Sequence, residues 1–159
     1  MKTLLKLALV VVINAYVAMV SAATMVEGER MLKAAIATVI AKGPVAAAQE
    51  FNAGGKWRVG STYIVLNDFN GTVLAHSANA KMTGKVMLEA KDAAGKPFVQ
   101  QCVHNIKTRG ESLIDVKWGS PITKRIADAQ MLSRRVPGHE LYISVLIFPA
   151  SPPAISKGH

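Results

Sequence analysis

The stretch TYIVLNDFNGTVLAH (residues 62–76) decides the fold class of this chain. It holds two β-prone runs, residues 62–66 and 72–76, on either side of Asn70-Gly71. Asn and Gly both tolerate the positive φ angles of tight turns, so this pair between two such runs is a strong hairpin signal. The sequence therefore predicts two antiparallel strands here and a sheet built around them.

Three further β-prone stretches follow in the C-terminal half. They cover residues 112–118, residues 122–126 leading into 130–135, and residues 141–148, with the turn Val136-Pro137-Gly138 before the last. Consecutive strands joined by short turns are typical of an antiparallel sheet. Together with the hairpin they predict an antiparallel sheet of five to six strands.

Helical patterns flank these strands. Residues 24–42, rich in Ala, Met, Leu and Ile, predict a long amphipathic helix that ends near Gly43. A shorter helix is expected from Pro44 to the stop at Gly54, and a third from Pro97 to about Thr108. Helices packed on an antiparallel sheet give the α+β class, and the length fits one domain.

One long segment is polar and rich in small residues. Residues 77–96 predict a loop with a short helix around residues 86–90. Loops of this length inside a compact domain are usually functional. We therefore expect a lid over a ligand site.

The first 22 residues predict a removable secretory signal. Lys2 and Lys6 give a positive start, residues 7–20 are almost entirely apolar, and small residues place cleavage near Ala22 or Ala23. This run is shorter than the about 20 residues of a bilayer span, although an uncleaved N-terminal anchor is the alternative. We expect a periplasmic or secreted protein, with one domain over residues 24–148 and a flexible tail over 149–159.

Charge and cysteine content limit the binding partners and the cross-links to be expected. Two of the 19 basic residues lie in the predicted signal, so 17 face 10 acidic residues in the remainder, a net charge of about +7. These basic residues are scattered, which disfavours nucleic-acid binding and favours attraction of small anions. Cys102 is the single cysteine, so no intramolecular disulfide forms, and its place in an apolar helical pattern indicates a buried packing residue.

The sequence lacks the residue spacings of the catalytic and metal-binding motifs that we compared with it. The four histidines form no i, i+4 pair and have no nearby Cys or carboxylate at ligand spacing. The Thr83-Gly84-Lys85 triplet lacks the first Gly and the hydroxyl residue of a phosphate-binding loop, and no Gly-x-Ser-x-Gly occurs. We expect no enzyme, no metal and no cofactor.

The remaining polar groups suit the binding of a small anion. His76 ends the second hairpin strand, Trp118 ends the next predicted strand, and Lys124 and Arg134 lie on the strands beside it. Positions where strands meet loops favour a pocket with an aromatic wall and fixed donors. The alternative for each residue is structural, with Trp118 in the core and the basic side chains in water.

An ordered series of segments resembles a known family. The segments are DFNGTVLAH (68–76), MTGK (82–85), KDAAGKPFV (91–99), WGSPITK (118–124) and RRVPG (134–138). They are similar to the bacterial single Cache domains of the Cache_2 type, and the similarity runs from about residue 43 to residue 148. The resemblance implies a PAS-like fold: a long N-terminal helix, then an antiparallel sheet whose one face and covering loop enclose a small-molecule site.

The same resemblance implies a function. Such domains are extracytoplasmic sensors that commonly bind acetate, propionate, pyruvate or lactate. With no second membrane segment and no signalling domain, this chain looks like a free-standing form that needs a membrane-bound signalling partner. His76, Trp118 and Arg134 match positions of the family's motifs. The resulting hypothesis is a pocket walled by Trp118 and Tyr63, in which His76 and Arg134 donate to a carboxylate.

Three departures from the family pattern leave a second hypothesis open. Many relatives carry Pro where this chain has Ser77, and Lys and Tyr where it has Ala129 and Leu132. Without those polar groups the ligand differs, binds weakly or is absent. The alternative function is then a ligand-free accessory protein, dimerising through the helix over residues 24–42.

Overall fold

The computed structural model describes residues 24–149, so the predicted signal segment and residues 150–159 of the predicted tail lie outside the described residues. One sheet of six strands forms the centre, and all its pairings are antiparallel. The strands are β1 (Arg58–Val59), β2 (Thr62–Asp68), β3 (Val73–His76), β4 (Glu111–Gly119), β5 (Ile126–Arg135) and β6 (Leu141–Ile147). Their order is β1-β2-β6-β5-β4. β3 pairs with the second half of β2, on the same edge at which β1 pairs with its first two residues.

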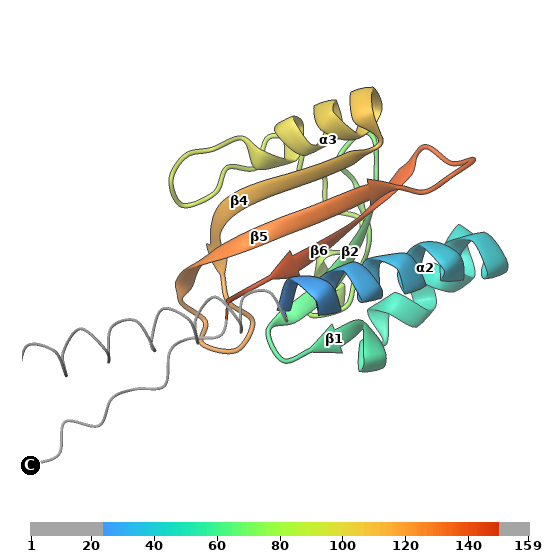
Figure 1. Cartoon of the computed structure of the whole chain (residues 1–159), viewed down its shortest axis with the longest axis horizontal. Coiled ribbons are helices and arrows are strands. Elements are labelled where there is room, and N and C mark those ends of the chain that lie inside the picture. The colour runs from blue at the N-terminus through green and yellow to red at the C-terminus, as the bar shows by residue number, and fades with distance from the viewer. Residues whose placement is uncertain (1–23, 150–159) are drawn as a thin grey trace, which may run out of the picture.

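Helices cover both faces of this sheet (Figure 1). The N-terminal helix over residues 24–42 and α2 (Pro44–Asn52) pack on one face. The second face carries α3 (Phe98–Arg109) and the segment over residues 77–97. Two short 3-10 helices, η1 (Gly55–Trp57) and η2 (Ala80–Met82), lie in the connections.

Each face has its own hydrophobic core. The N-terminal core, between the sheet and the N-terminal helix, includes Leu32, Phe51, Trp57, Ile64 and Val145. The pocket core, between the sheet and α3, includes Tyr63, Phe98, Cys102, Met131 and Leu146. Strands β2 and β6 are buried on both faces and read as continuous apolar runs, whereas β4 alternates exposed and buried residues because one of its faces is uncovered.

Glycines set the helix ends and one close contact. Gly43 has a φ of 81° immediately before Pro44, which starts α2, and Gly110 ends α3 in the left-handed conformation with its N–H bonded to the Ile106 carbonyl at 3.0 Å. Within the N-terminal helix, a Cβ on Gly28 would lie 2.4 Å from Ile147 Cδ1. The helix therefore lies close against β6 at a position without a side chain.

The predicted hairpin forms, but its loop is longer than a two-residue turn. β2 ends at Asp68 and β3 begins at Val73, and the Asp68 carboxylate accepts the N–H groups of Asn70 at 2.9 Å and Thr72 at 2.8 Å. Gly71 has a φ of 78°, and a Cβ there would lie 2.8 Å from the Leu88 nitrogen. The turn is thus shaped by its contact with the long segment that covers it.

Three expectations about elements differ from the structure. Residues 122–126 form a turn between β4 and β5, in which Lys124 has a φ of 59°, and only Ile126 belongs to a strand. Residues 86–90 form no helix; the 3-10 helix η2 occurs earlier, and Val86 makes an isolated bridge to Thr72. The short strand β1 was not predicted.

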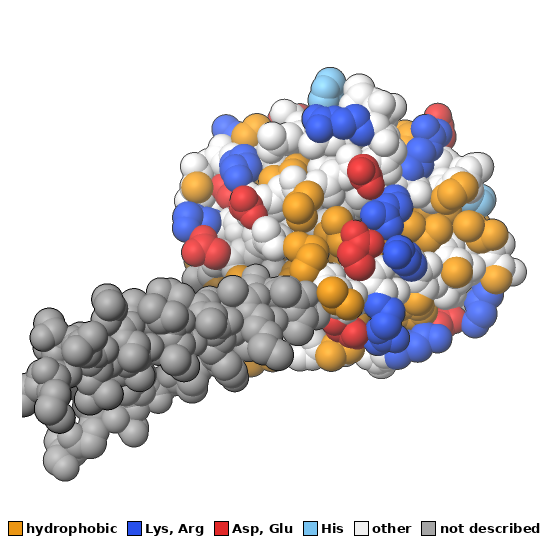
Figure 2. Space-filling model, in the orientation of Figure 1, with side chains coloured by type: hydrophobic (Ala, Val, Ile, Leu, Met, Phe, Trp, Pro, Cys, Tyr) orange, Lys and Arg blue, Asp and Glu red, His pale blue; other side chains and the backbone are white. Residues whose placement is uncertain are grey.

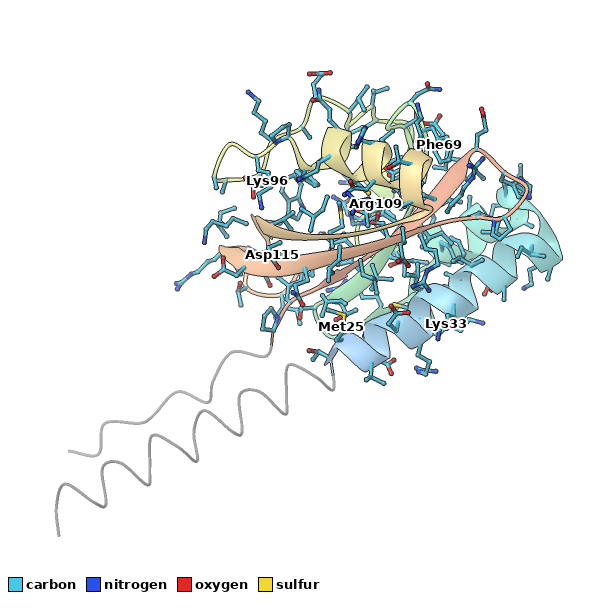
Figure 3. The ribbon with its side chains drawn as sticks, turned by 45° about the horizontal axis from the view of Figure 1, so that its top comes forward. Met25, Lys33, Phe69, Lys96, Arg109 and Asp115 are labelled. Atoms are coloured by element: carbon cyan, nitrogen blue, oxygen red, sulfur yellow. The ribbon has the colours of Figure 1, made fainter. Side chains whose placement is uncertain are left out.

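The surface carries mixed charge. On the face shown in Figure 2, Lys and Arg side chains lie singly or in small groups among acidic and apolar ones. Lys33 on the N-terminal helix is exposed and points away from the sheet (Figure 3). Within residues 24–149, no helix combines the length and the apolar character that a bilayer span requires.

Candidate functional site

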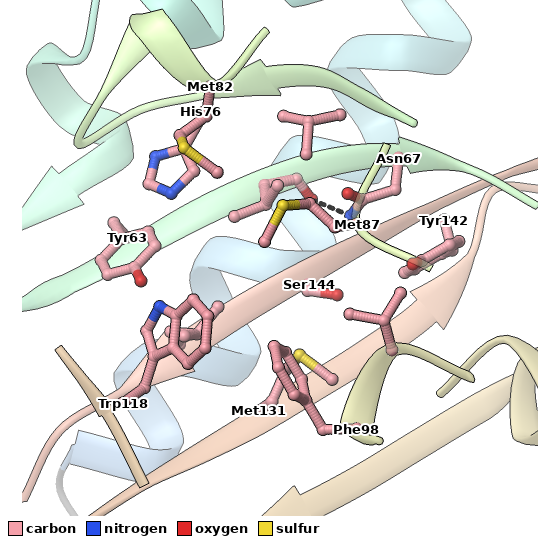
Figure 4. A pocket seen from close by; sticks show the side chains of 14 residues that line it. Tyr63, Asn67, His76, Met82, Met87, Phe98, Trp118, Met131, Tyr142 and Ser144 are labelled. Carbon is pink, nitrogen blue, oxygen red and sulfur yellow. Dashed lines mark hydrogen bonds between the residues drawn. The ribbon is translucent and has the colours of Figure 1, made fainter. Parts of the chain in front are cut away.

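A cavity of about 60 Å³ lies between the sheet and the long covering segment (Figure 4). Alternate residues of the two central strands form its floor, because successive side chains of a strand point to opposite faces. Strand β2 contributes Tyr63, Val65 and Asn67, and β6 contributes Tyr142, Ser144 and Leu146.

The walls and roof come from other elements. Trp118 at the end of β4 and Phe98 at the start of α3 pack with their ring centroids 4.9 Å apart. Met82 and Met87 from the covering segment and Met131 from β5 complete the lining. Thioether side chains are flexible and polarisable, so this part of the wall adapts to the shape of an apolar group.

His76 lies at one end of the cavity with a defined protonation state. Its Nδ1 accepts hydrogen bonds from the backbone N–H groups of Ala78 at 3.3 Å and Asn79 at 3.0 Å. Burial lowers the pKa of His76 from 6.5 to about 4. The imidazole is therefore neutral at pH 7 with its proton on Nε2, and it offers a single N–H donor.

Tyr63 stacks on His76 and faces Trp118. The Tyr63 and His76 rings are 4.8 Å apart at an interplanar angle of 24°. Burial raises the pKa of the Tyr63 hydroxyl, and hydrogen bonding with the Trp118 indole opposes this rise. Tyr63 thus stays protonated at neutral pH, and three of the predicted site residues meet in one pocket.

Lys124 lies outside this cavity. Tyr63, His76, Met82 and Trp118 also border an open hollow of about 610 Å³, and Lys124 lines its rim. Lys124 is exposed, as is Lys81 on the same rim. The hollow is therefore the mouth of the pocket, and its two lysines face solvent.

The structure places Arg134 on the opposite face of the sheet, which corrects its predicted position in the pocket. Its two terminal nitrogens each lie 3.3 Å from a carboxylate oxygen of Glu29 in the N-terminal helix, and one lies 3.6 Å from Glu111. Along β5, Met131 faces the pocket, so Leu132 and Arg134 both point to the other face, where Leu132 packs in the N-terminal core. Arg134 joins β5 to the helix and lines no part of the cavity.

Ser77 has a structural role at the end of β3. Its hydroxyl donates to the Trp57 carbonyl at 2.7 Å and accepts the Ile64 N–H at 3.0 Å. A proline at this position would lack both the hydroxyl and the N–H that bonds the Ile64 carbonyl at 3.0 Å. The departure from the family pattern is thus explained by a local network and not by a ligand contact.

The covering segment is fixed at both ends. The Asp92 carboxylate accepts the backbone N–H groups of Lys117 at 3.0 Å and of Lys96 and Ala94 at 2.9 Å, and these bonds hold the pKa of Asp92 below its usual range. Lys96 Nζ also donates to the Asp115 carbonyl; both residues are labelled in Figure 3. At its start, the Asn79 N–H bonds to His76 Nδ1 at 3.0 Å, and near its middle the Met87 N–H bonds to the Gly71 carbonyl at 2.8 Å.

Sequence reasoning missed several lining residues. Asn67 and Ser144 interrupt the apolar runs of β2 and β6, and Asn67 Nδ2 bonds to the Val65 carbonyl at 3.4 Å. A polar residue inside an otherwise apolar strand can be recognised in the sequence, so it could have indicated these two lining residues. Met82, Met87 and Tyr142 gave no comparable signal, because apolar and aromatic residues are the ordinary content of a core.

A buried row of three serines crosses the sheet beside Cys102. Ser112, Ser133 and Ser144 are direct neighbours on β4, β5 and β6, and Ser133 Oγ lies 2.7 Å from Ser144 Oγ. Burial raises the pKa of the Cys102 thiol. The thiol is therefore protonated and inert at neutral pH, which suits packing and not nucleophilic chemistry. Across residues 24–149, no group of three or more His, Cys, Asp or Glu side chains is placed to hold a metal ion.

Comparison with known proteins adds to this geometry. The sequence family described as Single Cache domain 2 matches residues 12–148. The chain belongs to this single Cache domain family. No curated protein matches the chain significantly.

Solved structures share the fold. The periplasmic sensor domain of a chemotaxis protein has a TM-score of 0.61 at 18% identity, covering 85% of this chain and 96% of that chain. A Cache chemosensory domain described for carboxylic acid recognition has a TM-score of 0.61 at 16% identity, covering 85% and 94%. A methyl-accepting chemotaxis protein from Vibrio parahaemolyticus gives 0.58 at 17% identity, covering 79% and 84%. The predicted α+β single Cache fold, with its six-stranded sheet, is confirmed.

Proposed function

We propose that this chain is an extracytoplasmic sensory module that binds a small molecule in the pocket formed by Tyr63, His76 and Trp118. The observation that carries the proposal is a cavity with an inward donor set, provided by the neutral His76 imidazole and the Tyr63 hydroxyl, under a covering segment fixed at both ends. Membership of the single Cache family and the fold shared with a periplasmic sensor domain support it.

In this proposal the signal passes to a partner. The proposed output is a contact between the sensory domain, described over residues 24–149, and a membrane-bound signalling protein. A periplasmic location follows the predicted signal segment and the similar sensor domains. The ligand class that the family resemblance implies is a short carboxylate, and one similar Cache domain is described for carboxylic acid recognition.

An accessory protein without a ligand is the second candidate. Val26 and Ile40 on the N-terminal helix and Val45 on α2 are 68%, 57% and 75% exposed. Exposed apolar residues of this kind favour a contact surface, through which two copies of the chain would pair. This candidate predicts a dimer in solution and no stabilisation by small molecules.

A thermal-shift panel tests the proposal. The panel holds acetate, propionate, pyruvate and lactate together with neutral analogues of matched size, each at millimolar excess. A ligand present at a hundred times its Kd raises the free energy of unfolding by about 2.7 kcal/mol, which shifts the melting temperature by several degrees. Stabilisation by none of the compounds would contradict a sensory pocket.

A matched pair of variants locates the site. Trp118→Ala removes a pocket wall, whereas Leu113→Ala changes an exposed residue on the other face of the same strand, β4. The first variant should lose the ligand-dependent shift and the second should keep it. Equal shifts in both would place binding elsewhere.

A further inference from the structure

We propose that the pocket selects an uncharged ligand, a small amide, ketone or alcohol with one hydrogen-bond acceptor on an apolar body, in preference to a carboxylate anion. The inference rests on the proposed function and specifies its ligand class. Its basis is the chemistry of the 14 residues that line the cavity (Figure 4).

None of these 14 lining residues, all within the described part of the chain, carries a formal charge at pH 7. Three of them titrate, namely Tyr63, His76 and Tyr142. Burial raises the pKa of both tyrosines and lowers that of His76 to about 4, so all three are neutral at physiological pH. The rest are aliphatic, aromatic, thioether, amide or hydroxyl groups.

The basic side chains that a carboxylate would need are occupied or outside. Arg134 pairs with Glu29 across the sheet. Lys107 and Arg135 lie over the Phe69 ring, 5.7 and 5.1 Å from its centroid. Lys81 and Lys124 are exposed at the mouth. Because water screens charges there, an ion pair with either lysine would stabilise a bound anion by only about 0–1 kcal/mol.

An anion in this cavity would be poorly compensated. A buried charge without an opposite charge costs several kcal/mol even after relaxation. Burial raises the pKa of Tyr142, and the negative charge of the nearby Asp68 carboxylate adds to this rise. The negative charge of Asp68 repels an anion, so the electrostatics near Tyr142 also disfavour a carboxylate.

The donors and the walls define what does fit. His76 Nε2–H and the Tyr63 hydroxyl present donors at one end, which suits a carbonyl or hydroxyl oxygen. Met87 and Phe98 border the space beyond them, whereas Met82 lies beside His76 (Figure 4). A water needs about 10–15 Å³ of cavity volume measured in this way, so the cavity of about 60 Å³ accommodates a molecule of roughly four to six heavy atoms.

Titration calorimetry with matched pairs tests the selection. The wild-type protein is titrated at pH 7.5 with propionamide against sodium propionate and with acetamide against sodium acetate. We expect each amide to bind at least tenfold more tightly than its acid, and its Kd to stay constant between low and high salt. Equal or tighter binding of the carboxylates would overturn the inference and leave the proposed function standing, whereas binding of neither series would remove both.

Variants at the mouth and in the wall sharpen the test. The double variant Lys81→Gln with Lys124→Gln should leave the amide Kd unchanged, and a tenfold loss of amide affinity would show that the mouth lysines hold the ligand.

Met131→Lys places an ammonium group in the pocket and should reverse the preference toward propionate. The matched control Met131→Leu should retain the preference for the amide. A folded Met131→Lys protein that still prefers the amide would count against the electrostatic argument, and the wild-type pairs decide the question if this variant does not fold.

Discussion

A single histidine both shapes the covering segment and faces the pocket. The two backbone N–H groups that bond His76 Nδ1 belong to the first residues of that segment, and the ring stacks on Tyr63. Protonation of Nδ1 would remove both bonds and place a charge among apolar groups. The neutral imidazole is therefore a condition of the folded state as well as of the proposed ligand contact.

The low pKa of His76 predicts a pH-dependent stability. The unfolded chain takes up this proton near pH 6.5 and the folded protein only near pH 4, so the free energy of unfolding falls between these values as pH falls. The loss attributable to this group is roughly 2–3 kcal/mol. Above pH 6.5 the group makes no pH-dependent contribution.

Urea unfolding at several pH values between 4.5 and 7.5 measures this loss. The His76→Gln variant should show a shallower decline than wild type over the window, because it has no proton to take up. His104→Gln, which changes an exposed histidine on α3, should follow the wild-type curve. Parallel curves for His76→Gln and wild type would contradict the assignment.

The buried hydroxyl of Ser77 gives a second prediction. Ser77→Ala leaves the Ile64 N–H and the Trp57 carbonyl without this partner, and an unsatisfied buried group costs about 1–3 kcal/mol. We expect a loss of that size in the free energy of unfolding, measured by urea titration. Ser61→Ala, in the half-buried turn before β2, should change it by less than about 0.5 kcal/mol. Equal effects of the two changes would contradict the proposed network.

Among the elements, Arg134 connects β5 with the N-terminal helix. Its side chain is 29% exposed and its contact with Glu29 is a partly solvated ion pair. We expect Arg134→Ala to lower the free energy of unfolding by about 0.2–1 kcal/mol and to leave ligand affinity unchanged, as calorimetry would show. A tenfold loss of ligand affinity at unchanged stability would show that Arg134 does contribute to ligand binding.

The elements also show what a single sequence can specify. The hairpin and the helix ends were predictable because local chemistry fixes them: Asn-Gly for the turn, and Gly43 and Gly110 for helix termination. Residues 122–126 were misassigned because Ile122 and Ile126 suggest a strand, although both are exposed. Their turn depends on the left-handed Lys124, a conformation that sequence patterns for non-glycine residues rarely indicate.

The candidate site was predictable in part for a related reason. Tyr63, His76 and Trp118 meet in one cavity as expected, and their role in binding stays a prediction. Arg134 was misplaced because a shift of one residue along a strand moves a side chain to the other face. Both faces of β5 are partly buried, so its alternation of apolar and polar residues did not reveal which face bears the pocket.

At the scale of the whole molecule, two cores share one sheet. β2 and β6 supply residues to the N-terminal core with one set of alternate positions and to the pocket core with the other. These two strands are therefore a direct structural connection between the pocket and the N-terminal helix. The N-terminal helix also carries part of the exposed apolar surface described above, so a partner placed there would lie on the far side of the shared strands from the ligand.

Because the cores share their central strands, we expect them to unfold as one cooperative unit. Trp57 reports on the N-terminal core and Cys102 on the pocket core, and both are buried. In a Trp118→Phe variant, Trp57 fluorescence follows the first core alone, while the rate of Cys102 thiol labelling follows opening of the second. Both probes should give the same dependence on urea, because the m-value scales with the surface exposed on unfolding. A smaller dependence for Cys102 labelling would mean that α3 opens locally, and the pocket would then belong to a less stable unit than the N-terminal helix.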